Sequence, residues 1–364
     1  MAEAVHSCSL GGGAEKAIKH KGNGALRRSV SFYFYILLCK MVFFSQNSIS
    51  LQLKFVILHT ISKEFLIYFM VRNIFKGLGI ALVTPFKQDG SVDYKALIRL
   101  VEYQLNNDAD FLCILATTGE TPTLTAEEKQ QIKETIVSIV NGRVPILMGC
   151  GGNNTAAIVE ELQTRDFKGI DGILSVCPYY NKPSQEGLYQ HFKAIANATK
   201  LPVVLYNVPG RTGINMTAAT TVRLARDCDN IIAIKEASGN LEQVNEIIKN
   251  KPRKFDVISG DDALTFPMIS CGAVGVISVI GNALPKEFSK MIRLQMKGEY
   301  DPARKIHHRF IDLFSLLFVD GNPAGVKAML HEMGYIENVL RLPLVPTRIS
   351  TLQRMSEIMK ELKI

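Results

Sequence analysis

The chain has 364 residues, of which 47% are hydrophobic and 21% charged, as in a globular protein and unlike a disordered one. Its net charge of +8 is uneven, because residues 1–69 contribute +5 and the rest of the chain only +3, so nothing favours a nucleic-acid partner. The seven cysteines are scattered and include no Cys-x-x-Cys pair, which favours reduced thiols in a cytoplasmic protein over disulfides or zinc.

Residues 1–69 differ in character from the rest of the chain. Phe, Tyr, Ile and Leu are frequent there, but the best apolar run, 32–44, is broken by Lys40 and is shorter than the roughly 20 residues that a membrane span needs. The segment lacks the small-residue cleavage site that a signal peptide needs. A transit peptide remains an alternative, because the segment contains serines and few acidic residues. We interpret 1–69 as an N-terminal extension that is disordered or not native, with translation beginning at Met70, and we predict no membrane association.

Short apolar runs alternate with longer amphipathic stretches from Gly77 onward. The apolar runs are nearly continuous, as expected of strands covered on both faces, and comprise residues 79–83, 111–116, 145–149, 172–176, 203–206, 231–235, 256–259 and 274–279. The amphipathic stretches predict helices near 93–107, 125–140, 154–165, 184–198, 217–227, 240–249, 262–270 and 285–297. Thr125, Ser184 and Thr217 are suitable N-caps, and Thr125 with Glu128 forms a capping-box pattern.

Eight such strand–helix units predict an α/β fold, a closed (β/α)8 TIM barrel over residues 70–298. The alternative is an open doubly wound sheet, but no Gly-x-Gly-x-x-Gly motif opens a helix after the first strand. Residues 299–364 contain further helical stretches near 301–318, 322–333 and 350–361. They predict a C-terminal helical appendix to the barrel.

The active site of such a barrel lies at the C-terminal ends of its strands. At those ends the sequence places hydroxyls, phenols, one guanidinium and one lysine, within the segments 117–120, 178–183, 206–213, 231–235, 260–262 and 275–278. That combination is poorly suited to a structural cap and well suited to carbonyl chemistry.

Lys235 is the most informative of these residues, because it closes the apolar run that begins at Ile231. Burying an ammonium is costly, and burial lowers a lysine's pKa. A neutral amine can condense with a carbonyl to form a Schiff base. The alternative is a strand-end lysine that reaches solvent or pairs with Glu236.

Three other positions offer complementary chemistry. Thr117 and Thr118 can present hydroxyls and backbone amides to a carboxylate or an oxyanion. Tyr206, close to Lys235 in such a barrel, can act as a general acid or base. Arg211 presents a rigid fork suited to a substrate carboxylate. Taken alone, the two threonines are more often a strand end, Tyr206 a buried core phenol and Arg211 a surface residue. Their position at the same end of the barrel favours an active site.

Two further groups of residues stand at strand ends. Gly260 and Gly275 would let the backbone approach a small ligand closely. Asp261 and Asp262 could hold a divalent ion, but an N-cap role for the following helix is favoured. The histidines of this region form no His-x-x-x-His arrangement. We therefore predict no metal site, and no cofactor, since lysine-based chemistry needs none.

Taken together, these motifs resemble those of the dihydrodipicolinate synthase / N-acetylneuraminate lyase family of class I aldolase-type barrels, from about Gly77 to the C-terminus. The segments that carry the resemblance are Gly-Leu-Gly-Ile-Ala-Leu-Val-Thr-Pro-Phe, Thr-Thr-Gly-Glu, Pro-Tyr-Tyr-Asn-Lys-Pro, Tyr-Asn-Val-Pro-Gly-Arg-Thr and Ile-Lys-Glu-Ala-Ser. The resemblance implies that Lys235 forms a Schiff base with pyruvate and that the derived enamine attacks aspartate semialdehyde, the committed step toward diaminopimelate and lysine.

The resemblance also implies roles for single residues. Tyr206 would donate and accept protons, with Thr117 and Tyr180 completing a relay, and Tyr180 would cross a tight dimer interface into the neighbouring site. Thr118 and Ile277 would contact pyruvate. The expected assembly is a homo-oligomer, a dimer of dimers.

Arg211 would hold the carboxylate of the semialdehyde. Sialic-acid lyases of this fold lack an arginine in that turn, so Arg211 favours the synthase branch of the family. The alternative from another class is a barrel that has kept the fold as a binding or regulatory protein, but both Lys235 and Tyr206 are present.

One departure from the family pattern concerns regulation. Lysine-inhibited members carry a histidine and a glutamate where this chain has Lys129 and Ala157, although Asn153 and Tyr179 fit the pattern. An α-ammonium ligand would lose its carboxylate partner and meet Lys129 instead. The sequence therefore predicts weak or absent inhibition by lysine.

Overall fold

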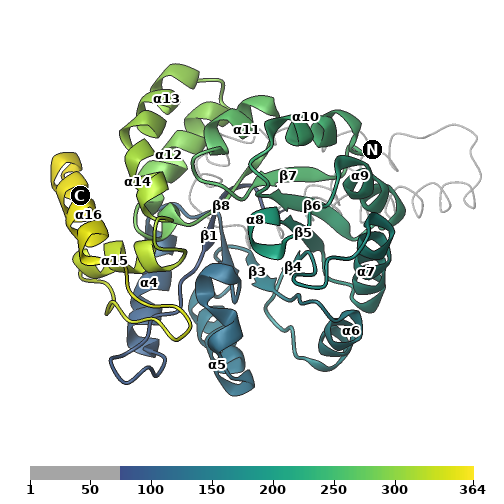
Figure 1. The fold of residues 1–364 in the computed structure, drawn as a ribbon, viewed down its shortest axis with the longest axis horizontal. Helices are drawn as coiled ribbons and strands as arrows, with labels where there is room; N and C mark the ends of the chain where they lie inside the picture. The colour runs from purple at the N-terminus through teal and green to yellow at the C-terminus, as the bar shows by residue number, and fades with distance from the viewer. Residues whose placement is uncertain (1–73) are drawn as a thin grey trace, which may run out of the picture.

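The computed structural model describes residues 74–364, so the predictions for 1–69 and for a start at Met70 lie outside the described residues. Eight parallel strands form a closed barrel in chain order (Figure 1), and β8 pairs with β1. The strands are β1 Gly77–Ala81, β2 Phe111–Ile114, β3 Ile146–Gly149, β4 Gly172–Val176, β5 Val203–Asn207, β6 Ile231–Glu236, β7 Asp256–Ser259 and β8 Gly275–Ser278. The predicted TIM barrel is thus confirmed, and the pairing of β8 with β1 excludes the open sheet.

Helices surround the barrel in the predicted order, with one additional short helix after β5 that the sequence did not predict. They are α4 Tyr94–Asn106, α5 Ala126–Val140, α6 Thr155–Thr164, α7 Gln185–Ala198, α8 Pro209–Thr212, α9 Ala218–Asp227, α10 Leu241–Asn250, α11 Thr265–Cys271 and α12 Pro285–Met296. Thr125, Ser184 and Thr217 each cap a helix as predicted, and Thr125 forms the capping box with Glu128. Each cap satisfies amide groups that have no partner inside the helix.

The C-terminal helices are α13 Tyr300–Arg309, α14 Ile311–Leu316, α15 Ala324–Glu332 and α16 Ile349–Leu362, and they flank one side of the barrel in Figure 1. The helical stretch predicted near 301–318 is present as two helices, because the chain leaves helical geometry at Phe310 and buries that ring in the core. No described helix is long and apolar enough to cross a membrane. The division of the chain at residue 298 stays a prediction.

Two glycines close the barrel between its first and last strands. Gly275 pairs with Gly77, and a Cβ added at Gly275 would lie 2.2 Å from the Gly77 carbonyl oxygen. Gly275 therefore lies at the start of β8, at the opposite end of the barrel from the C-terminal strand ends, which form the mouth of the barrel. The expectation that it lets a ligand approach was wrong, because here the close neighbour is backbone.

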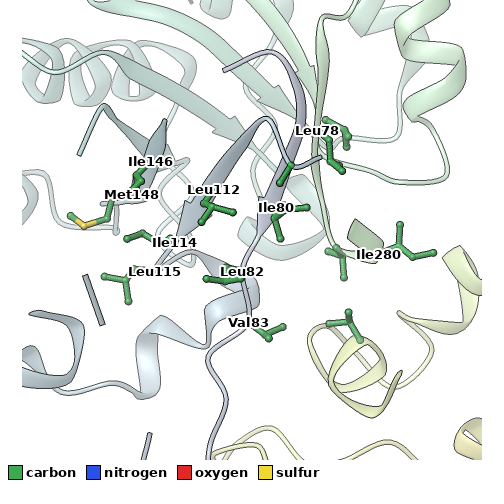
Figure 2. Close-up of a cluster of buried hydrophobic side chains, with 14 of the residues drawn as sticks. Leu78, Ile80, Leu82, Val83, Leu112, Ile114, Leu115, Ile146, Met148 and Ile280 are labelled. Carbon is green, nitrogen blue, oxygen red and sulfur yellow. The ribbon is translucent and has the colours of Figure 1, made fainter. Parts of the chain in front are cut away.

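The strands bury both of their faces, as their continuous apolar sequences predict. Figure 2 shows the outer face, where Leu78 and Ile80 of β1 lie beside Leu112 and Ile114 of β2 under the helices. The alternate residues point into the barrel and form a second cluster, which contains Phe75, Phe111, Cys113, Leu147, Leu174, Val204, Tyr206, Ile232, Ile258 and Ile277. This inner cluster fills the barrel interior beneath the side chains at the C-terminal strand ends.

Candidate active site

Lys235 and Tyr206 face each other at the mouth of the barrel. They are register partners on β6 and β5, and only 5% of Lys235 and 6% of Tyr206 is exposed. Lys235 Nζ lies 4.4 Å from the centroid of the Tyr206 ring. Lys235 is therefore not a lysine that reaches solvent, and it contacts a side chain that can exchange protons.

Glu236, the alternative partner of Lys235, points to the other side of the strand. Its carboxylate accepts hydrogen bonds from Asn207 Nδ2 at 3.1 Å, from Gln243 Nε2 at 3.3 Å and from the Ser238 amide at 2.8 Å. Burial raises the pKa of this carboxyl group, while these hydrogen bonds act in the opposite direction. The network joins the ends of β5 and β6 behind Tyr206 and Lys235, and sequence reasoning missed it because Asn207 lies on another strand, 29 positions from Glu236.

Gly260 lies directly against the lysine. A Cβ at this position would come within 3.1 Å of Lys235 Cε and 2.7 Å of the Ala237 side chain. Gly260 thus leaves space for the Lys235 side chain, whereas the sequence suggested that this glycine lets the backbone approach a ligand. Ile277 is buried in the same inner cluster as Tyr206. Cys113 belongs to this cluster too, and desolvation raises the pKa of its thiol to about 11.

Thr117 and Thr118 form a tight turn immediately after β2. The segment Thr117–Gly119 is a single 3-10 turn whose end is fixed by Thr84 Oγ1, which donates to the Gly119 carbonyl at 2.7 Å. Thr118 is buried, and its hydroxyl accepts a hydrogen bond from Asn322 Nδ2 at 3.0 Å. The turn therefore brings a buried hydroxyl to the same end of the barrel as Lys235.

Arg211 belongs to α8, the short helix that follows β5. Its side chain is exposed and makes no hydrogen bond or ion pair within residues 74–364. The backbone amide of Tyr180 donates to the Thr212 carbonyl at 3.3 Å, which ties the loop after β4 to this helix. An unpaired guanidinium beside the barrel mouth is available to an anionic ligand.

Tyr180 does not pack into the pocket of its own chain. Its side chain is 88% exposed, and its φ of 74° lies in the left-handed region that non-glycine residues rarely adopt. The structure brings Lys235, Tyr206, Gly260 and Ile277 together at the mouth, whereas a single chain leaves the Tyr180 phenol pointing away.

The predicted N-cap role of Asp261 and Asp262 was wrong. The helix α11 begins at Thr265, because Asp262 Oδ2 instead accepts the amides of Val279 at 3.0 Å and Ile280 at 2.8 Å. Burial raises the pKa of Asp262 to about 6. Asp261 makes a local turn through the amides of Ala263 and Leu264. Across residues 74–364, no three His, Cys, Asp or Glu side chains gather in a way that could hold a metal ion.

Comparison with known proteins identifies relatives along nearly all of the described residues. Residues 74–362 match the Dihydrodipicolinate synthetase family. The 4-hydroxy-tetrahydrodipicolinate synthase of Phocaeicola vulgatus is 68% identical over 295 residues, which are 81% of this chain and 99% of that protein.

Two solved structures are similar throughout the barrel. DHDPS from Cyanidioschyzon merolae with lysine bound has a TM-score of 0.77 and 43% identity, covering 79% of this chain and 98% of that one. The chloride-inhibited dihydrodipicolinate synthase from Acinetobacter baumannii, complexed with pyruvate, has a TM-score of 0.78 and 40% identity, covering 80% of this chain and 100% of that one. With these relatives and with the family match over 74–362, the chain belongs to the dihydrodipicolinate synthetase family of enzymes.

Proposed function

We propose that this enzyme condenses pyruvate with aspartate semialdehyde to give 4-hydroxy-tetrahydrodipicolinate, a step of lysine and diaminopimelate biosynthesis, through a Schiff base on Lys235. The observation that carries the proposal is the buried Lys235 facing Tyr206 at the barrel mouth. The name of the relative from Phocaeicola vulgatus and the pyruvate bound to the protein from Acinetobacter baumannii support the same reaction.

Schiff-base formation begins when Lys235 Nζ attacks the C2 carbonyl of pyruvate and water leaves. Loss of a proton from the C3 methyl group gives an enamine, whose C3 attacks the aldehyde carbon of the second substrate. The aldehyde oxygen takes up a proton, and the amino group of the product then attacks C2 and releases Lys235 as the ring closes. Tyr206 is the general acid and base for these transfers, because its ring lies 4.4 Å from Lys235 Nζ.

The walls of the pocket hold the substrates. Thr118 donates its hydroxyl to the pyruvate carboxylate, Ile277 limits the space around the reacting carbons, and Gly260 leaves room beside Lys235 because it has no side chain. Thr117 and the Tyr180 of a second subunit extend the proton relay from Tyr206. Tyr180 is 88% exposed in a single chain, as a side chain that completes a neighbour's site would be, and this supports a homo-oligomer. We propose that this homo-oligomer is a dimer of dimers.

The test of the function is a coupled assay on the purified protein with two substrate pairs. We expect turnover with pyruvate plus aspartate semialdehyde and none with pyruvate plus N-acetylmannosamine. Turnover of the second pair alone would place the enzyme in the lyase branch of the family. The absence of both turnover and a borohydride-trapped pyruvate adduct would favour a binding or regulatory protein.

Arg211→Ala is expected to weaken the second substrate selectively. An exposed guanidinium that binds a carboxylate contributes about 1.5–3 kcal/mol, so the KM for aspartate semialdehyde should rise roughly 10- to 100-fold. The KM for pyruvate should change little, because the arginine lies outside the buried Lys235 pocket. Arg354→Ala, on the surface of α16, is the matched control. Equal rises in the two KM values would contradict the assignment.

Feedback inhibition by lysine is expected to be weak. Asn153 Nδ2 donates to the Tyr179 carbonyl at 3.2 Å, but Lys129 and Ala157 replace the two residues that lysine-inhibited members provide. Initial rates over a range of L-lysine concentrations measure this, and a micromolar inhibition constant would refute it. The double variant Lys129→His/Ala157→Glu supplies the missing groups and should become more sensitive to lysine than the unmodified enzyme.

A further inference from the structure

The C-terminal segment reaches the turn after β2 through a single side chain. Asn322 lies between α14 and α15 and is buried, and its Nδ2 donates to Thr118 Oγ1, a residue 204 positions earlier in the chain. Asn322 Oδ1 is also buried, and it has no hydrogen-bond partner within residues 74–364. The amide therefore makes its side-chain hydrogen bond to Thr118 alone.

This hydrogen bond decides the direction in which the Thr118 hydroxyl donates. A threonine hydroxyl has one proton to donate and two lone pairs that accept. Because Asn322 donates to one lone pair, the proton of Thr118 is left for another acceptor. Within residues 74–364 the Thr118 hydroxyl donates to no protein acceptor, so its proton is free for a bound ligand. A hydroxyl that donates to an ionised carboxylate makes a stronger hydrogen bond than one to a neutral acceptor.

A buried ion pair joins the same two segments a few residues further on. Lys327 of α15 pairs with Glu120, and both side chains are 0% exposed. Lys327 Nζ also donates to the Val339 carbonyl at 2.9 Å, and the Arg341 amide donates to Glu120 Oε2 at 3.1 Å. Burial lowers the pKa of Lys327 to about 8, although the charge of Glu120 opposes that shift.

The backbone of the turn is strained on both sides of the threonines. Leu115 has a φ of 50° and Glu120 a φ of 53°, and both are non-glycine residues in the left-handed region. Such conformations persist only where the surrounding structure enforces them. The Glu120 backbone is held within the turn, where its amide donates to the Thr117 carbonyl at 3.1 Å, and its carboxylate is held by Lys327 and the Arg341 amide of the C-terminal segment.

We propose that Asn322 is a positioning residue for substrate binding, which directs the Thr118 hydroxyl proton toward the carboxylate of pyruvate. The Lys327–Glu120 pair fixes the position of the Asn322 side chain relative to the turn Thr117–Gly119. This inference rests on the proposed function, since it takes Thr118 as a contact of pyruvate. Asn322 acts through Thr118 and does not itself touch the reacting atoms.

The test measures the pyruvate concentration that half-saturates borohydride trapping on Lys235, together with the KM for each substrate. Asn322→Ala should raise the half-saturating pyruvate concentration and the pyruvate KM about tenfold, with kcat and the semialdehyde KM within about twofold. Asn322→Ser, whose shorter side chain does not reach Thr118, should behave in the same way and serves if the alanine variant does not fold. Unchanged pyruvate binding in a folded variant overturns the proposal.

Asn322→Asp tests the direction of the hydrogen bond. A carboxylate at this position accepts the Thr118 proton and places a like charge near the substrate, so pyruvate binding should be weaker than in Asn322→Ala. Binding in Asn322→Asp as tight as in the unmodified protein would overturn the proposal, because Thr118 would then already donate to residue 322. Asn245→Ala removes an exposed amide that donates to the Leu241 carbonyl of the same helix, and it is the matched control.

A double-mutant cycle shows whether Asn322 acts through Thr118. The variant Thr118→Val removes the hydroxyl, and adding Asn322→Ala to it should cause no further loss of pyruvate affinity. Additive losses would mean an independent role and would overturn the proposal. The unmodified enzyme distinguishes failure of the proposed function from failure of the role given to Asn322. If it forms no adduct with pyruvate, the proposed function fails. If it forms one and the Asn322 variants bind pyruvate normally, only this inference fails.

Discussion

Lys235→Ala is expected to lower kcat/KM by about 1,000-fold or more, because the proposed Schiff base needs the Lys235 amine and alanine has none. Borohydride treatment with pyruvate should label the unmodified enzyme on Lys235 and leave the variant unlabelled. Lys235→Arg keeps the positive charge but cannot form the same imine, so it should be equally inactive. Mass spectrometry of the trapped protein and the coupled assay together measure both effects.

The control for this prediction is Lys249→Ala, which removes an exposed lysine near the end of α10. It should leave turnover and labelling unchanged. Turnover by Lys235→Ala near that of the unmodified enzyme, or an adduct found on another lysine, would contradict the assignment of the nucleophile.

Lys327→Met should destabilise the fold more than any surface ion-pair change. The side chains of Lys327 and Glu120 are both fully buried, so removing the lysine leaves a buried carboxylate without its counter-charge. Breaking a buried pair in this way costs roughly 3–5 kcal/mol in the free energy of unfolding. Urea denaturation followed by far-UV circular dichroism measures the loss, a suitable signal because the chain has no tryptophan.

Two further variants make this prediction specific. Glu120→Gln/Lys327→Met removes both charges and should recover much of the lost stability, since the penalty comes from the uncompensated charge. Lys254→Met breaks the pair with Asp229, whose side chain is 90% exposed, and should cost no more than about 1 kcal/mol. A Lys327→Met protein as stable as the unmodified one would show that the pair contributes nothing to folding.

The sequence predicted the barrel and its mouth because both depend on local patterns. Continuous apolar runs mark strands that are covered on both faces, and the residues just beyond each run, such as Lys235, must then meet at one end. The caps at Thr125, Ser184 and Thr217 are likewise local, because each acceptor lies within three residues of its donor.

The errors and omissions arose where distant residues decide the outcome. The helix predicted from 262 begins three residues later because Asp262 binds amides 17 and 18 positions away. The bond from Asn322 to Thr118 and the Lys327–Glu120 pair span 204 and 207 positions, and no periodicity in the chain reports them. Glu236 could have been assigned correctly, because the alternation of strand residues places it opposite to Lys235.

The contact between Asn322 and Thr118 also orders events during protein synthesis. The ribosome makes the turn after β2 early and makes α15 near the end of the chain. A nascent chain that has completed all eight strands still lacks the donor to Thr118 and the counter-charge to Glu120. The Thr118 hydroxyl and the Glu120 carboxylate therefore gain these two partners only after the segment that contains Asn322 and α15 has been synthesised.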